Sequence, residues 1–307
     1  MQTVDSEYLR VLLKNLFPGL VIEEVLKESG QRVVYFAHFK EGEALIKRQV
    51  SWGKIVLKAT EELTAKQIAY LQKEIDILHS LKSPYYPKLL FHKVYSQNPI
   101  TEERLKKRLF VTIEERLDAK PLSDVRNRFI DEKSVLGLLE KLVIALSLLW
   151  KHESKLVHRD IKPENILIYE NGEVAIIDLG IIREEGAVGL TLTHAPWGPC
   201  SPPYASPEQA KNDKKNILFK SDFFSLGILA YELISGKNPF ITDPDISNDE
   251  ILENICQLKP PTLISLGKAT AGVSNLIEKL MSKEPYQRHR TIDQLLRHIQ
   301  AVWEEFS

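Results

Sequence analysis

The segment from His158 to Asn165 holds an unusual density of side chains that can do chemistry. It contains a carboxylate in Asp160, two cationic side chains, an imidazole and a carboxamide in Asn165. Short apolar runs flank it, and Pro163 is incompatible with a continuous helix, so we expect a polar loop between two short strands. An Asn-Gly pair then predicts a tight turn into a further strand, which ends at Asp178. Two carboxylates and a carboxamide should therefore meet at the edge of one small hairpin.

This segment resembles the catalytic loop of protein kinases. Residues 158–165 match the motif H-R-D-x-x-x-x-N at every defined position, and residues 178–180 resemble D-F-G with leucine in the middle. The resemblance implies that Asp160 orients the attacking hydroxyl and accepts its proton, and that Lys162 contacts the transferred phosphate. Lysine at this position is the form typical of serine/threonine kinases. The alternative is a charged turn in an unrelated α/β protein.

The same motifs imply a nucleotide and a divalent cation. Asn165 and Asp178 would bind Mg²⁺ through oxygen, the ligand atom that this hard cation requires, and Mn²⁺ could replace it. The implied cofactors are therefore ATP and Mg²⁺. The family motifs also give supporting roles to His158, Arg159, Leu179 and Gly180.

A second group of matching residues lies in the first third of the chain. The run 54–58 resembles the V-A-I-K strand, in which Lys58 would contact the α- and β-phosphates. Apolar residues at helical spacing predict a helix over 64–81, with Glu74 toward its buried side. A buried glutamate needs a partner, and the resemblance implies that this partner is Lys58. The alternative is that Glu74 lies at the border of the helix and is solvated.

The expected glycine-rich loop departs from the family. Residues 21–40 look strand-like with a break at 29–31, where only Gly30 remains. Lys27, Ser29 and Arg32 stand where kinases have their three glycines, so side chains could obstruct the close approach of backbone to phosphate. Taken by itself, the segment would be an ordinary hairpin turn.

The remaining nucleotide contacts rest on the resemblance. Val34 and Val56 would lie above the adenine and Leu167 beneath it, with Glu115 and Leu117 in the hinge. Spacing leaves open whether Ile113 or Glu114 is the gatekeeper. The charged run 101–108 predicts a solvated loop between strands at about 89–96 and 108–113.

Residues 181–205 show little periodicity and predict a long loop, which in a kinase would be the activation segment. Thr191 and Thr193 are candidates for phosphorylation, where a phosphate could pair with Arg159 and order the loop. Unmodified polar residues are an equally good interpretation. Cys200 replaces a glycine of the family pattern, and its thiol is expected to be passive.

Further along the chain, the resemblance assigns structural roles to four residues. Ser201 belongs to the peptide-docking segment, and Glu208 would pair with Arg288. Asp222 would support the catalytic loop from below, or would complement the dipole at a helix N-terminus, or both.

The predicted fold is α+β: the two-lobed kinase fold, with a small antiparallel-sheet lobe that carries one key helix and a larger, mainly helical lobe. We expect a helical extension at 1–19 and a kinase domain at 20–305. Within this domain the N-lobe would span about 20–114, the hinge about 115–120 and the C-lobe about 121–305. No appended second domain is expected.

Composition excludes several classes of function. The 307 residues include 27% charged and 43% hydrophobic residues, with a net charge of −1, so no basic field favours nucleic acid. Two cysteines support no disulfide framework and suit a reducing compartment. The N-terminus lacks the pattern of a signal peptide, and no apolar run is long enough for a membrane span, so we expect a cytoplasmic protein.

The sequence therefore predicts a serine/threonine protein kinase that transfers the γ-phosphate of Mg-ATP to protein substrates and phosphorylates its own activation segment. A regulatory protein or a phosphatase is an expected partner. We expect regulation through the activation segment, the N-terminal helix or such a partner. One alternative is a pseudokinase that acts as a binding or scaffold module, favoured by the depleted glycine loop and Leu179. Another is a small-molecule phosphotransferase on a kinase-like fold.

Overall fold

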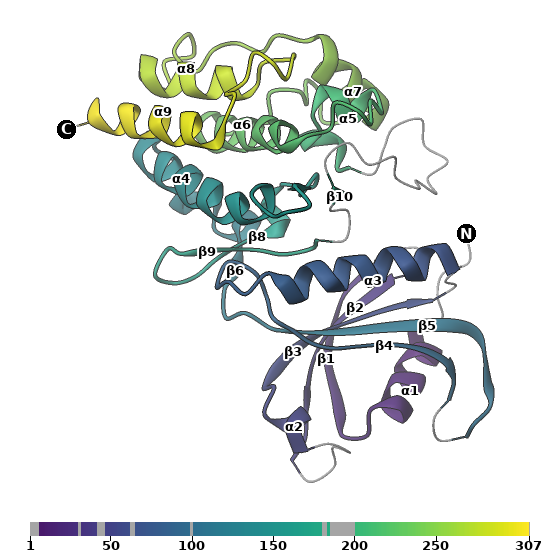
Figure 1. Ribbon diagram of the computed structural model, residues 1–307. Coiled ribbons are helices and arrows are strands. Elements are labelled where there is room, and N and C mark those ends of the chain that lie inside the picture. The colour runs from purple at the N-terminus through teal and green to yellow at the C-terminus, as the bar shows by residue number, and fades with distance from the viewer. Residues whose placement is uncertain are drawn as a thin grey trace. The chain divides into compact units, whose positions relative to one another are not determined.

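The computed structural model describes residues 6–29, 32–41, 47–61, 65–98, 101–179, 183–184 and 200–306. The chain divides into two compact units, 1–118 and 119–307. The first is built on an antiparallel sheet and the second is mainly helical (Figure 1). This confirms the predicted α+β fold.

The first unit contains a five-stranded antiparallel sheet with strand order β1-β2-β3-β5-β4. Its strands are β1 (Leu20–Ser29), β2 (Arg32–Phe39), β3 (Lys54–Glu61), β4 (Leu89–Gln97) and β5 (Arg104–Glu115). The expected loop at 101–108 was partly wrong, because residues 104–108 extend β5 and Arg104 pairs with Gln97 of β4. This end of β5 reaches beyond the end of β3, so its charged side chains remain in solvent.

The two faces of this sheet have different covers. Side chains alternate along each strand, and one face buries Tyr35, Leu57 and Ile113. Helix α1 (Ser6–Leu16) packs its leucines into this same core. A short helix, α2 (Lys47–Val50), comes between β2 and β3 in the chain. Helix α3 (Ala65–Ser80) packs Ile75 against Phe110 on the opposite face. The sheet therefore lies between α1 and α3 (Figure 1).

The second unit is organised around α6 (Phe219–Ser235), which is buried on nearly all sides. It contacts α4 (Glu132–Trp150) and α8 (Ala271–Leu280), and α4 also contacts α9 (Ile292–Glu304) (Figure 1). Helices α5 (Pro207–Ala210) and α7 (Asn248–Gln257) complete the set among the described residues. Of the helices that the structure describes, none combines the length and apolar character needed to span a bilayer.

Within the described part of the second unit, five short strands carry its polar loops. They are β6 (Lys120–Pro121), β7 (Leu156–Val157), β8 (Ile166–Ile168), β9 (Val174–Ile176) and β10 (Arg183–Glu184). β8 and β9 form the hairpin predicted from the Asn-Gly pair, and Gly172 in its turn has φ = 80°. β10 pairs with β7, so part of the segment expected as a loop is extended.

Candidate active site

The hairpin β8–β9 places Asn165 and Asp178 at one edge. Asn165 closes a single 3₁₀ turn that begins at Pro163, and its carbonyl accepts a hydrogen bond from the N–H of Ile177 at 2.9 Å. Asp178 follows directly with φ = 61°, in the left-handed region, and Leu179 behind it is buried. The hairpin thus fixes the two acceptor side chains that flank it at neighbouring positions.

Asp160 lies in a dense set of contacts within the loop. Its Oδ2 atom is 2.8 Å from Nζ of Lys162 and accepts a hydrogen bond from Nδ2 of Asn165 at 2.9 Å. The same Nδ2 also donates to the backbone carbonyl of Asp160, at 2.9 Å. Oδ1 of Asp160 is buried and has no hydrogen-bond partner among the described residues. Oδ2 of Asp160 is thus held in place, whereas the lone pairs of Oδ1 remain available as acceptors.

Ser201 connects a distant segment to this loop. Nζ of Lys162 donates to Oγ of Ser201 at 2.6 Å, so Lys162 bridges a carboxylate and a hydroxyl. Next to it, burial raises the pKa of the Cys200 thiol to about 11, and the negative charge of Asp160 adds to this effect. The thiol is therefore protonated at neutral pH.

Asp222 supports the loop from within the core. It is completely buried in the first turn of α6, and its two oxygens accept the backbone N–H groups of His158 (2.9 Å) and Arg159 (2.8 Å). A third hydrogen bond comes from the indole of Trp150 at 2.8 Å. Burial raises the pKa of Asp222, and these donors oppose that rise. The contacts fix the backbone at Arg159, which has φ = 72°.

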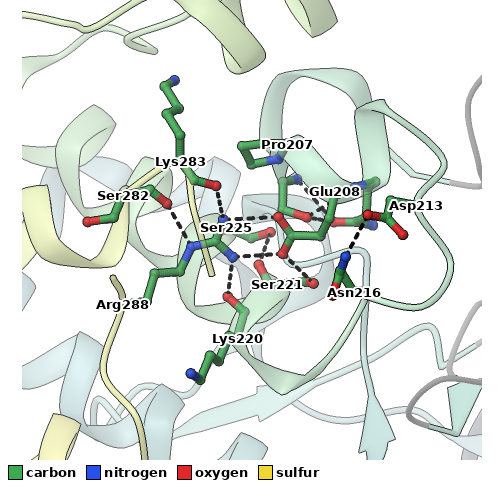
Figure 2. Close-up of polar contacts among 12 residues, drawn as sticks. Pro207, Glu208, Asp213, Asn216, Lys220, Ser221, Ser225, Ser282, Lys283 and Arg288 are labelled. Atoms are coloured by element: carbon green, nitrogen blue, oxygen red, sulfur yellow. Dashed lines mark hydrogen bonds and ion pairs between the residues drawn. The ribbon is translucent and has the colours of Figure 1, made fainter. Parts of the chain in front are cut away.

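Glu208 and Arg288 form a buried two-pronged ion pair (Figure 2), with N–O distances of 2.7 and 3.0 Å. The guanidinium also donates to the carbonyls of Lys220, Ser282 and Lys283. In addition, Oγ of Ser221 donates to Glu208 at 2.6 Å.

The residue after Glu208 ties this segment to the loop 158–165. Gln209 of α5 donates through Nε2 to the carbonyl of Arg159 at 2.8 Å. Its Oε1 accepts the N–H of Ser206, which completes the capping box of α5. The backbone of the catalytic loop is therefore held from α6 on one side and from α5 on another.

Sequence reasoning missed a second network, centred on Glu232 of α6. Its Oε1 is 2.6 Å from NH1 of Arg126, and its Oε2 accepts the hydroxyl proton of Tyr204 at 2.6 Å. Burial, with the charge of Glu232, raises the pKa of Tyr204. No local sequence pattern indicates these contacts, because Arg126, Tyr204 and Glu232 lie far apart in the chain.

In the first unit, Lys58 is paired within the sheet. Its Nζ atom is 2.7 Å from Oε1 of Glu114 on β5, and both side chains are nearly buried. Cross-strand pairing places Glu114 opposite Val56 and Thr112 opposite Lys58, so all four side chains share one face. Ile113 points into the core on the other face, so of the two gatekeeper candidates only Glu114 faces Lys58.

The expected partner of Lys58, Glu74, lies in α3, but its side chain is outside the described part of the chain. Glu114 was not recognised as a partner from the sequence. The available signal was the two-residue periodicity of β3 and β5, which puts Lys58 and Glu114 on one face once the register is known.

The adjoining residues, expected to form the hinge, are also anchored to the sheet. The guanidinium of Arg116 stacks on the ring of Phe36 at 3.6 Å and binds Glu23 at 2.8 Å. Oε1 of Glu115 accepts the N–H of Lys88 at 2.9 Å, and Leu117 is half-buried.

Three more residues were predicted to contact the nucleotide: Val34, Val56 and Leu167. Val34 and Val56 are half-buried on the face of Lys58, and Leu167 is buried in β8 of the second unit. Gly30, Gly180, Thr191 and Thr193 lie outside the described residues.

Comparisons with known proteins agree with this geometry. A family model described as protein kinase domain matches residues 44–299. The serine/threonine-protein kinase PknA of Corynebacterium glutamicum is 36% identical over 175 residues, which cover 56% of this chain and 34% of that protein. The serine/threonine-protein kinase PrkC of Bacillus subtilis is 31% identical over 172 residues, covering 56% of this chain and 25% of that protein.

A longer match is to a probable serine/threonine-protein kinase of Clostridium perfringens, 27% identical over 279 residues, or 90% of this chain and 37% of that protein. The chain thus spans between a quarter and two fifths of the length of these relatives. The matched family range covers well over half of the chain and includes Lys58, Asp160, Asn165 and Asp178. The chain belongs to the protein kinase domain family.

Proposed function

We propose that this protein is a serine/threonine protein kinase that transfers the γ-phosphate of ATP to hydroxyl groups of protein substrates. The observation that carries the proposal is the arrangement at Asp160. Lys162 and Asn165 hold one carboxylate oxygen, and the other has no hydrogen-bond partner among the described residues. A carboxylate fixed in this way can accept a hydrogen bond from the substrate hydroxyl and take its proton.

The residues at the hairpin edge fit a hard divalent cation. Among the described residues, the amide nitrogen of Asn165 makes both hydrogen bonds of this side chain, which leaves its carbonyl oxygen available to a metal. Asp178 adds a carboxylate from the neighbouring position. Oxygen donors of this kind suit Mg²⁺, or Mn²⁺ in its place, and the cation would neutralise charge on the phosphates of ATP.

Lys162 would serve the transferred phosphate. Its ammonium lies between Asp160 and Ser201, so it can accompany negative charge that moves from nucleotide to acceptor. Ser201 begins the segment that would dock a peptide around the acceptor residue. This bridge favours a protein substrate over a small alcohol, which would need no such segment.

In the first unit, Lys58 would bind the α- and β-phosphates, with Val34 and Val56 as apolar contacts for adenine on the same face. Gly30, Glu115 and Leu117 complete the proposed nucleotide contacts there. In the second unit, Leu167 is proposed as an adenine contact. Glu74 remains the proposed partner of Lys58 when nucleotide is bound.

Regulation is proposed to act on the activation segment. Phosphate on Thr191 or Thr193 would bring a charge that Arg159 can bind, and a phosphatase or regulatory protein would reverse or control this state. The proposed kinase domain spans 20–305, with α1 as a helical extension that is packed on the sheet.

The test is transfer from γ-³²P-ATP with Mg²⁺ to the protein itself and to a general protein acceptor. Wild-type protein should label Ser or Thr, and Asp160→Asn should abolish the labelling. Asp249→Asn, an exposed acid in the first turn of α7, is the matched control and should label normally.

Two results would favour the alternatives. ATP binding without labelling in the wild type would favour a pseudokinase. Labelling of small alcohols or aminoglycosides but not of proteins would favour a small-molecule phosphotransferase.

A further inference from the structure

The pair Lys58–Glu114 lies entirely within one sheet. Glu114 is opposite Val56, which lies two residues before Lys58 on β3, so the side chains of Lys58 and Glu114 meet diagonally across neighbouring strands. Their charged atoms are 2.7 Å apart, and the side chains are only 11% and 5% exposed. The strand ladder places both side chains on one face of the sheet.

The carboxylate of Glu114 is not required for packing. The other side chains around it on this face are apolar except for Thr112: Val56 and Leu89 lie opposite it on the neighbouring strands, and Val34 and Phe36 follow on β2. An apolar side chain would fit such a position at lower cost, because a buried carboxylate loses its hydration. The charge of Glu114 is therefore matched specifically to that of Lys58.

Pairing with Glu114 changes how strongly Lys58 can attract a polyanionic ligand. A single ammonium attracts phosphate as a net positive charge, whereas a lysine paired with a carboxylate at 2.7 Å has almost no net charge. If phosphate took Lys58 away from Glu114, the carboxylate would be left buried without its cation, which is costly.

We propose that Glu114 restrains ATP binding by neutralising Lys58, so that the charge of Glu114 sets the affinity of the site for the phosphates. The inference rests on the proposed function, because it assigns Lys58 to the phosphates of ATP. Glu114 acts through Lys58 and is a positioning residue. Its charge discriminates between ligands with and without phosphates.

The experiment compares wild-type protein with Glu114→Gln, which keeps the shape and removes the charge. Calorimetric titrations with ATP, ADP and adenosine separate the phosphate contribution from that of the base. In Glu114→Gln the affinity for ATP should rise by about tenfold or more, while that for adenosine stays the same. Glu103→Gln, an exposed acid just before β5, is the control and should match the wild type.

A second measurement needs no nucleotide. Acetylation of the Lys58 amine by acetic anhydride, followed by mass spectrometry, should be faster in Glu114→Gln, because the amine is no longer engaged by a carboxylate at 2.7 Å. Adding Lys58→Met to either protein should remove the difference in ATP affinity, as expected for a coupled pair.

Three outcomes would overturn the inference. Equal ATP affinities in wild type and Glu114→Gln would do so while leaving kinase activity intact. Weaker ATP binding in the variant would mean that Glu114 prepares Lys58 for phosphate. Absence of ATP binding in both proteins would also remove the proposed function, and phosphate transfer by the wild type would then be absent as well.

Discussion

Arg288 binds both carboxylate oxygens of Glu208, at 2.7 and 3.0 Å, from a side chain that is completely buried. The two residues lie 80 positions apart, and their contact joins the loop before α9 to α5. Three carbonyl groups share the remaining N–H donors of the guanidinium (Figure 2). Such a pair makes the integrity of the second unit depend on one side chain.

Replacement of Arg288 by methionine should destabilise the second unit by about 3–5 kcal/mol, because Glu208 would remain buried without its cation. Arg288→Lys should recover only part of this loss, since an ammonium cannot bind two oxygens in parallel. Urea unfolding followed by circular dichroism measures both variants. Arg297→Met on the exposed side of α9 is the control, and equal losses for the two methionine variants would contradict the prediction.

Asp222→Asn should separate support of the catalytic loop from overall packing. Asparagine has one acceptor oxygen, so its NH₂ group would face a backbone N–H of His158 or Arg159 and leave that donor unpaired. We expect a stability loss of about 1–3 kcal/mol. Displacement of the loop should lower the rate of phosphate transfer by about a hundredfold.

Trp150→Phe is the matched control for Asp222→Asn. It removes the third hydrogen bond to Asp222 and leaves both loop contacts in place. It should therefore reduce stability with little effect on transfer. If both variants lost transfer equally, the specific role of the backbone contacts would be wrong.

The sequence best predicted those parts of the site whose residues lie close together in the chain. The hairpin β8–β9 and its loop could be predicted because strands, turn and acceptors follow one another within 21 residues, from His158 to Asp178. Their relative placement depends on short-range backbone geometry, which residue types determine well.

Contacts that depend on register or on distant segments could not be predicted in the same way. Lys58 meets Glu114 because β3 and β5 pair in one particular register, and a shift of one residue would have placed Ile113 there. Likewise, Glu232 meets Arg126 only after α6 has packed in the second unit. The strand over 104–108 pairs with β4 through Arg104, a contact that composition does not reveal.

Removal of Mg²⁺ should show whether Asp178 is one of its ligands. In thermal denaturation, ATP should stabilise the wild type more in Mg²⁺ than in EDTA. Asp178→Asn should lose most of this Mg²⁺-dependent increment, because a neutral amide binds the cation more weakly than a carboxylate. Glu170→Gln, exposed between β8 and β9, should keep it. A full increment in Asp178→Asn would exclude Asp178 as a ligand.

Acid should destabilise the second unit through His289 and His298. Nε2 of His289 is 2.9 Å from Nδ1 of His298, and the buried ring of His289 also packs edge-on against Phe223. Burial, with nearby Lys279 and His298, lowers the pKa of His289 to about 3 from its ordinary 6.5. Burial and Lys279 also lower the pKa of His298, against the opposing charge of Glu305.

The direction of the pH effect on stability follows from the lowered pKa values of His289 and His298. Below pH 6.5 the unfolded chain takes up protons that the folded His289 does not, so the free energy of unfolding should fall as pH decreases from about 6.5 toward about 3. Above pH 6.5 the pair should contribute no pH dependence. Urea unfolding at a series of pH values should give a smaller slope in this window for His289→Gln. Lys279→Gln should reduce the slope less, because it removes only one cause of the lowered pKa. An unchanged slope in His289→Gln would show that other groups account for the acid sensitivity.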